Sequence, residues 1–174
     1  ELREQKRSDL RRVTWLRPRA LGEYAELDPS SIRNLELLKP MRADESGGTL
    51  LSVLDKTGSA MGARLLRRWI THPLRDVARI ERRLDGVEWL RKDVFTRRET
   101  ELVLHGIADI ERLIGRVTLE RANARDLVAL RRSLGLFPRM SKTLDAASPP
   151  PIAEEIVEAL QGFDEIAERI AATL

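Results

Sequence analysis

The side chains that could do chemistry are two histidines, a few neighbouring carboxylates and one glycine pair. Neither His72 nor His105 belongs to a recognisable metal-binding motif of His, Cys and acidic residues. Gly47-Gly48-Thr49 lacks the G-x-x-x-x-G-K-[ST] spacing that surrounds a phosphate with backbone amides. Glu154 and Glu155 are adjacent, so on a helix they diverge by about 100° and cannot converge on one substrate atom. Cysteine is absent, which excludes thiolate nucleophiles and disulfides. We therefore predict no catalytic, cofactor-binding or metal site in this chain.

The composition is that of a folded domain of ordinary size. The 174 residues are 42% hydrophobic and 34% charged, and a chain of this length can bury roughly 70% of its unfolded surface without metals or disulfides. Apolar runs such as residues 102–104 are far shorter than the ~20 residues that cross a bilayer, which excludes a transmembrane protein. Residues 1–7 contain neither a methionine nor the apolar stretch of a secretory signal. We expect a piece of a longer protein.

The net charge of +3 conceals two asymmetries. Of the 31 basic residues 26 are arginine, and residues 145–174 carry a net charge of −6 while the rest of the chain carries +9. A basic body is compatible with binding to nucleic acid, because phosphate affinity grows with the number of cations. No block of Lys and Arg is dense enough for a nucleic-acid patch, however, so we favour ordinary solvated helix faces.

Hydrophobic residues recur with the period of a helix throughout the chain. Stripes at steps of 3 and 4 occupy residues 77–87, 107–117 and 127–137, and a longer one runs from Ile152 to Ile170. The last stripe predicts a single helix of about 23 residues, about 35 Å long. Together with only 4% aromatic residues, these stripes predict an all-α fold: a multi-helical, bundle-like core domain with a long C-terminal helix.

Capping residues and prolines divide the helical pattern into elements. Helix starts are predicted at Asp28, Ser59, Asp76 and Asn123, and helix ends before Pro73 and Pro138. Residues 148–151 read SPPP and predict a stiff, extended linker. These signals divide the chain into residues 1–20, a body over 21–145 and a last helix within 146–174.

Two segments carry unusual detail. Residues 27–37 read LDPSSIRNLEL, and residues 49–69 read TLLSVLDKTGSAMGARLLRRW. They resemble the core domain of the MutS family of DNA mismatch repair proteins, which carries L-D-x-x-T-x-x-N-L-E-L and then L-D-x-T-x-T-x-M-G-x-R-L-L-x-x-W. Ser31 and Ser59 stand where the family usually has Thr, which keeps the hydroxyl. The resemblance continues in order through residues 72–76, 80–88, 109–113 and 125–134.

The resemblance implies a part of a larger machine. Residues 1–20 would be a linker helix from the connector, 21–145 the core, and 146–174 the lever helix leading toward the clamp. The domain would be non-catalytic and would couple the ATPase to the DNA clamp. ATP and Mg would bind elsewhere in the parent protein, a cytoplasmic homodimer that binds mismatched duplex DNA.

The motif residues receive structural roles under the same resemblance. Asp28 is the helix cap, and Met61 belongs to the second motif. Buried charge-assisted bonds or caps are expected of Asn34, Glu36, Asp55, Thr57 and Arg64. Gly62 is expected to permit a close approach of helices.

Two alternatives from other functional classes remain. The chain could be a standalone helical scaffold that binds a protein through the stripe of residues 152–174, or a basic helical module that binds nucleic acid through Arg67, Arg68, Arg82 and Arg83. Whatever the function, the apolar stripe of residues 152–174 needs a partner, because leaving its large side chains in water is costly. We expect this helix to fold back on the body, to pair with a second molecule, or to be poorly ordered beyond about Leu160.

Overall fold

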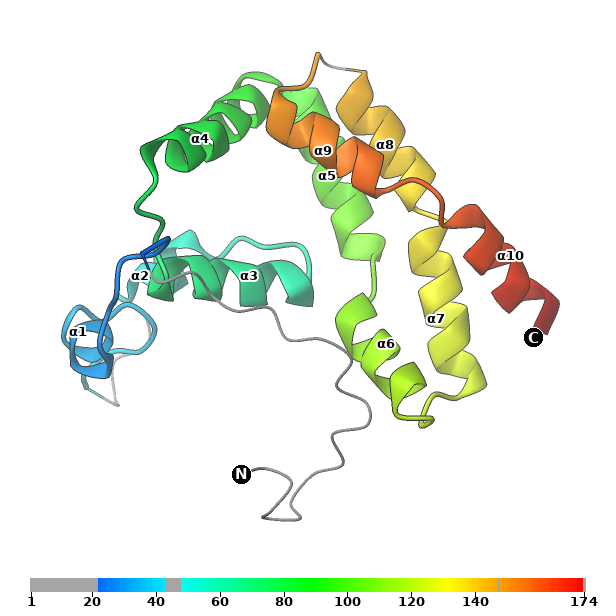
Figure 1. Cartoon of the computed structure of the whole chain (residues 1–174), viewed down its shortest axis with the longest axis horizontal. Coiled ribbons are helices and arrows are strands. Elements are labelled where there is room, and N and C mark those ends of the chain that lie inside the picture. Colours follow the sequence, from blue (N-terminus) through cyan, green and yellow to red (C-terminus); the bar gives the residue numbers. More distant parts are fainter. Residues whose placement is uncertain (1–21, 43–47, 147, 174) are drawn as a thin grey trace.

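The structure is a computed structural model and describes residues 22–42, 48–146 and 148–173 (Figure 1). Its helices are α1 (Pro29–Asn34), α2 (Leu50–Leu54), α3 (Ala60–Thr71), α4 (Val77–Lys92), α5 (Val94–Gly106), α6 (Ile110–Thr118), α7 (Ala124–Leu134), α8 (Phe137–Asp145), α9 (Pro151–Ala159) and α10 (Asp164–Thr173). Within the described ranges, β pairing is limited to one isolated bridge between Tyr24 and Leu74. The all-α prediction is confirmed.

Local side-chain caps begin the helices, as predicted. The backbone amides of Ser31, Gly62, Arg79 and Asp126 donate to the side chains of Asp28, Ser59, Asp76 and Asn123, at 2.8, 3.1, 3.0 and 3.1 Å. Each pair satisfies an amide that the first helical turn leaves without a partner. Helix α3 ends at Thr71, before Pro73, also as predicted.

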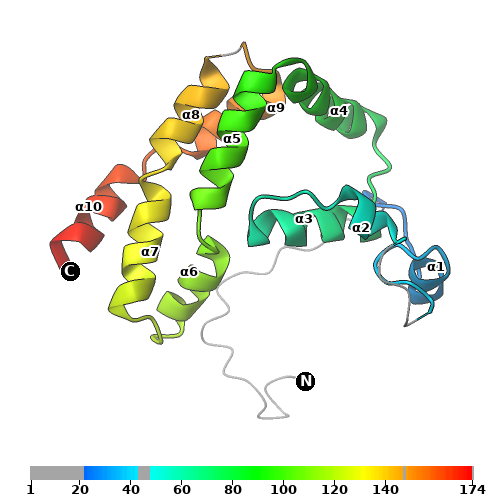
Figure 2. The same cartoon turned by 180° about the vertical axis from the view of Figure 1, so that it is seen from behind.

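The helices form an arch with an open underside (Figures 1 and 2). At its crown α9 packs against α8 and α4, and α5 packs against α8. One limb holds α6, α7 and α10, and α3 lies across the open side. One core cluster centres on Val103, Met140 and Leu144, and a second one on Leu113, Leu130 and Leu134. The body is therefore two packed clusters joined along α5, α8 and α7.

The C-terminal segment is helical, but as two helices rather than the single one that the stripe predicts. Helix α9 ends at Ala159 and α10 begins at Asp164. Between them Gly162 has a φ of +80°, which no continuous right-handed helix contains. The turn lets Phe163 pack edge-on against Phe137, with ring centroids 5.2 Å apart.

The same turn returns the apolar stripe to the body. Helix α10 packs along α7, and Ile170 contacts the second core cluster. Ala153 of α9 is buried. Of the three outcomes expected for this stripe, the structure has the first: it folds back on the body.

Of two proline-based predictions, the helix end before Pro138 is confirmed and the extended linker is corrected. Pro138 lies in the first turn of α8, where its missing amide costs no hydrogen bond, and α7 has already ended at Leu134. Pro150 has an extended backbone, but Pro151 already begins α9, which packs directly against α8, so the segment does not hold the last helix away from the body. The predicted linker helix over residues 1–20 lies outside the described residues.

Candidate functional site

The first motif forms the turn around α1. The Asp28 carboxylate accepts hydrogen bonds from the backbone amide and the hydroxyl of Ser31. The hydrogen bond from the amide is the main reason that the pKa of Asp28 is lowered. Glu36 has a φ of +47°, and its Oε1 accepts from the amide of Met41 at 2.7 Å. Asn34 is exposed at the last position of α1, not buried as expected.

The second motif shapes the entry to α3. Asp55 Oδ1 accepts from the hydroxyl of Thr57 at 2.6 Å and from its amide at 3.1 Å, and these bonds lower the pKa of Asp55. A Cβ on Gly62 would lie 3.2 Å from Ser59 Oγ and 3.5 Å from Thr57 Cβ. Gly62 therefore permits close approach of this preceding loop, which corrects the expectation of a helix–helix contact. Met61 faces the underside of the arch.

Arg64 makes the longest-range polar contact of the motif. Its Nη1 and Nη2 donate to the two carboxylate oxygens of Asp109 at 2.8 and 2.7 Å, while Nε and Nη2 donate to Glu111 Oε2 at 3.0 and 2.5 Å. Asp109 also caps α6 through the amide of Arg112. We call Arg64, Asp109 and Glu111 the clasp. It fixes the side of α3 to the start of α6.

The clasp is a surface feature, not the buried one that was expected. The side chain of Arg64 is 49% exposed and that of Glu111 is 68% exposed. The guanidinium nevertheless holds the pKa of Asp109 at about 2, well below its usual range, because its N–H groups bond the charged carboxylate. The same bonds raise the pKa of Arg64. Both groups are therefore charged at neutral pH.

Other arginines pair with acids on neighbouring helices. Arg82 of α4 contacts Glu155 of α9, Arg116 of α6 contacts the buried Asp126 of α7, and Arg139 of α8 contacts Glu99 of α5 at 2.8 Å. These three arginines, like Arg64, therefore join one helix to another. Of the four arginines considered for nucleic-acid binding, Arg67 and Arg68 are exposed, while Arg82 and Arg83 already contact other side chains.

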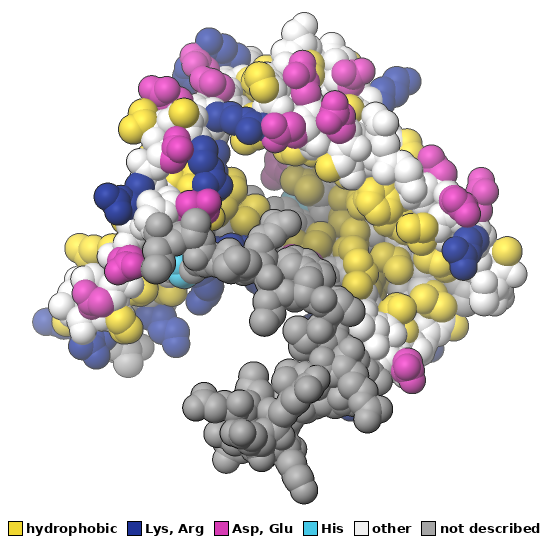
Figure 3. Space-filling view, viewed as in Figure 1, with side chains coloured by type: hydrophobic (Ala, Val, Ile, Leu, Met, Phe, Trp, Pro, Cys, Tyr) yellow, Lys and Arg dark blue, Asp and Glu magenta, His cyan; other side chains and the backbone are white. Residues whose placement is uncertain are grey.

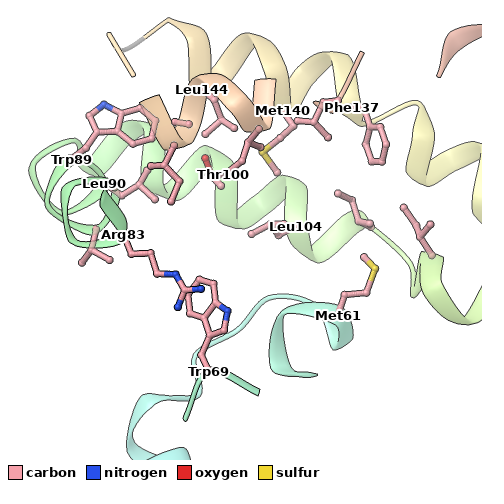
Figure 4. Close-up of a pocket in the computed structure, with 18 residues that line it drawn as sticks. Met61, Trp69, Arg83, Trp89, Leu90, Thr100, Leu104, Phe137, Met140 and Leu144 are labelled. Atoms are coloured by element: carbon pink, nitrogen blue, oxygen red, sulfur yellow. The ribbon is translucent and has the colours of Figure 1, made fainter. Parts of the chain in front are cut away.

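An apolar groove occupies the underside of the arch (Figure 3). Side chains of α3, α4, α5, α8 and α9 line a cavity of about 570 Å³. Trp69 of α3 and Arg83 of α4 meet at its edge, where the guanidinium carbon lies 3.8 Å from the indole centroid (Figure 4). Thr100 Oγ1 is shielded from water there and has no hydrogen-bond partner among the described residues. Trp69 forms part of the groove wall.

The described ranges contain no group of three or more His, Cys, Asp or Glu that could hold a metal ion. In the same ranges, none of the helices has the length and apolarity needed to span a membrane.

Comparison with known proteins identifies the arch and its motifs. A sequence model of MutS domain III matches residues 30–174. The chain belongs to the MutS family. It is 40% identical over 171 residues to the DNA mismatch repair protein MutS of Geobacillus kaustophilus, and 45% identical over 141 residues to that of Desulfitobacterium hafniense. The DNA mismatch repair protein MutS of Methanococcoides burtonii is 39% identical over 145 residues.

These alignments cover most of this chain and little of each MutS relative. They span 97%, 81% and 83% of the chain, but 19%, 16% and 16% of the three relatives. The resemblance inferred from residues 27–37 and 49–69 is therefore confirmed. The clasp and the groove are features of a MutS domain III, and both involve α3, which carries the second motif.

The sequence analysis did not name the caps Asp109 and Thr49 or the partners of Arg64. Asp109 lies within the stripe of residues 107–117 and is of a residue type that favours the N-cap position, so its role as the cap of α6 was detectable. Thr49 likewise caps α2 through the amide of Ser52. The partners of Arg64 were not detectable, because 45 and 47 residues separate it from the two acids.

Proposed function

We propose that this chain is the core, or lever, domain of a MutS-type mismatch-recognition ATPase. It is non-catalytic, and it couples the nucleotide state of the ATPase to engagement of the DNA clamp. ATP and Mg bind elsewhere in the parent protein, a cytoplasmic homodimer that binds mismatched duplex DNA. The match to MutS domain III over residues 30–174 carries this proposal.

The clasp supports a role in transmission. Coupling between distant sites needs packed elements that hold discrete arrangements. Helix α3 spans the open side of the arch, and Arg64 ties it to α6 through two carboxylates. Displacement of α3 is thereby passed to α6 and, through the second core cluster, to α7 and α10.

The test uses the full-length parent protein carrying Arg64→Met. Coupling is measured as the ratio of nucleotide affinities with and without mismatched duplex. We expect this ratio to fall by about twofold or more, while basal ATP hydrolysis is retained. Arg68→Met is the matched control, because Arg68 is an exposed arginine one helical turn further along α3. An unchanged ratio in Arg64→Met, or an equal fall in Arg68→Met, contradicts the role of the clasp.

The isolated chain provides a second test. It should neither bind nor hydrolyse ATP, because it lacks a phosphate loop. Micromolar affinity for ATP in calorimetry would refute the assignment of the nucleotide site to another part of the parent protein.

A further inference from the structure

A serine lies fully buried in the second core cluster. Ser133 of α7 is 1% exposed, the least of any polar side chain in the described ranges. It follows Leu130 by three residues and precedes Phe137 by four, so it shares the helix face that packs into this apolar cluster. Burying a hydroxyl among apolar side chains is costly unless the hydroxyl is hydrogen-bonded. The hydrogen bonds of Ser133 therefore indicate its role.

The Ser133 hydroxyl acts as donor and as acceptor at the same time. It donates to the carbonyl oxygen of Ala129, one turn earlier in α7, at 2.8 Å. It accepts from the backbone amide of Ala108, 25 residues away in the sequence, at 3.0 Å. The bond within α7 fixes the direction of the hydroxyl proton, as is common for a serine inside a helix. The oxygen then presents its lone pairs to Ala108.

Ala108 belongs to the link of residues 107–109, between the end of α5 and the start of α6. The backbone of this link is not helical, with ψ of 120° at Ile107 and 81° at Asp109. Its amides therefore need partners outside the two helices, and Ser133 supplies one. The next residue, Asp109, bonds Arg64 in the clasp. The link is thus held by α7 on one side and by α3 on the other (Figures 1 and 2).

We propose that Ser133 is a positioning residue for the clasp: by holding Ala108, it fixes the backbone from which Asp109 reaches Arg64. The two parallel bonds between guanidinium and carboxylate, at 2.8 and 2.7 Å, weaken steeply when their distances or angles change. Neighbouring Cα atoms are held 3.8 Å apart, so a displaced Ala108 also displaces Asp109. The clasp side chains of Arg64 and Glu111 are exposed, whereas Ser133 is anchored in the core.

This assignment names the contact through which α7 acts on the clasp. Helix α7 packs against both α6 and α10, and Ser133 connects it to the residue beside Asp109. A rigid hydrogen-bonded connection of this kind can carry a displacement between elements that are not in direct contact. The inference deepens the proposed transmission through the clasp, and its meaning in the parent protein rests on that function.

The pKa of Asp109, measured by NMR in the complete 174-residue chain, tests the assignment. Ser133→Ala leaves unchanged the charged groups around Asp109, which are Arg64, Glu111 and Arg112. We expect the pKa of Asp109 to rise from about 2 to about 2.5 or higher, toward its ordinary value of about 3.9. Leu130→Val is the matched control, because it alters the same face of α7 without removing a hydrogen bond. Its Asp109 pKa should stay at about 2.

Hydrogen exchange of the Ala108 amide provides a second measurement, which does not depend on how well Ser133→Ala folds. The two variants compared are Arg64→Met and Arg68→Met, both at exposed positions of α3. If Ser133 and Arg64 hold the same link, loss of the clasp should speed exchange at Ala108 by about twofold or more. Arg68→Met should leave this rate unchanged.

Three results overturn the assignment. They are an unchanged Asp109 pKa in folded Ser133→Ala, an equal rise in Leu130→Val, and equal exchange at Ala108 in the two arginine variants. Neither measurement involves nucleotide or DNA. Failure of this inference is therefore distinct from failure of the proposed function, which the coupling ratio of the parent protein tests.

Discussion

The turn between α9 and α10 gives a prediction whose sign depends on the structure. Gly162 has a φ of +80°, and a Cβ built on it meets no atom within 4 Å. The substitution Gly162→Ala therefore adds backbone strain without any clash. An L-residue in this left-handed region costs about 1–2 kcal/mol. We expect the free energy of unfolding to fall by about 1 kcal/mol, which corresponds to a fall in Tm of about 2–4 °C for a domain of this size.

If residues 152–170 formed one continuous helix, Gly162→Ala would raise the free energy of unfolding instead of lowering it. Within a helix, replacing Gly by Ala is stabilising by about 1 kcal/mol, so the two arrangements differ by about 2 kcal/mol. Gly115→Ala is the matched control. Gly115 lies inside α6, where a Cβ also meets no atom within 4 Å. This substitution should raise the stability by up to about 1 kcal/mol.

Urea unfolding followed by circular dichroism at 222 nm, with a thermal melt, measures both variants. The expected result is a lower midpoint for Gly162→Ala and a higher one for Gly115→Ala. If Gly162→Ala is stabilised as much as the control, the turn is absent and the stripe from Ile152 to Ile170 forms one helix after all. Equal destabilisation of both variants would refute the helix-propensity argument itself.

Three further predictions concern the clasp, the core and the charge of the body. Arg64 holds the pKa of Asp109 at about 2, so the stabilisation from this carboxylate is fully present above its unfolded pKa of about 3.9 and is lost as the pH falls toward 2. The difference in urea midpoint between the unsubstituted chain and Asp109→Asn should therefore shrink between about pH 3.9 and pH 2. A difference that stays constant down to about pH 2 would contradict this prediction. Met140 is buried in the first core cluster, so Met140→Ala should lower the free energy of unfolding, measured with urea, by about 2–5 kcal/mol. The control Val53→Ala lies at an exposed position of α2 and should change the free energy of unfolding by less than about 0.5 kcal/mol. Binding of the isolated chain to duplex DNA should be weak, strongly dependent on salt and indifferent to a mismatch; a tenfold gel-shift preference for mismatched duplex would contradict this.

The sequence by itself determined the all-α class and the starts of four helices, α1, α3, α4 and α7. An N-cap and its amide are three residues apart, as in Asp28 with Ser31 or Asn123 with Asp126, so the signal and the structure lie in the same short window. The stripe of residues 127–137 identified an inward face, with Leu130 and Leu134 buried, whereas Val77, Leu84 and Val87 of the stripe over residues 77–87 are exposed. The two motifs identified the family, because they preserve residue types at fixed local spacing.

Only the tertiary structure decided how these helices meet. The apolar stripe of residues 152–170 continues across the turn at Gly162, because α9 and α10 both pack an apolar face against the body. The periodicity therefore could not show that the segment forms two helices. Two contacts join side chains that are far apart in the sequence: Arg64 pairs with Asp109, and Arg83 stacks on Trp69. Any of 26 arginines could have made such contacts. Periodicity and capping depend on neighbours a few residues apart, whereas the partners of Arg64 and the groove beneath the arch depend on how whole helices pack.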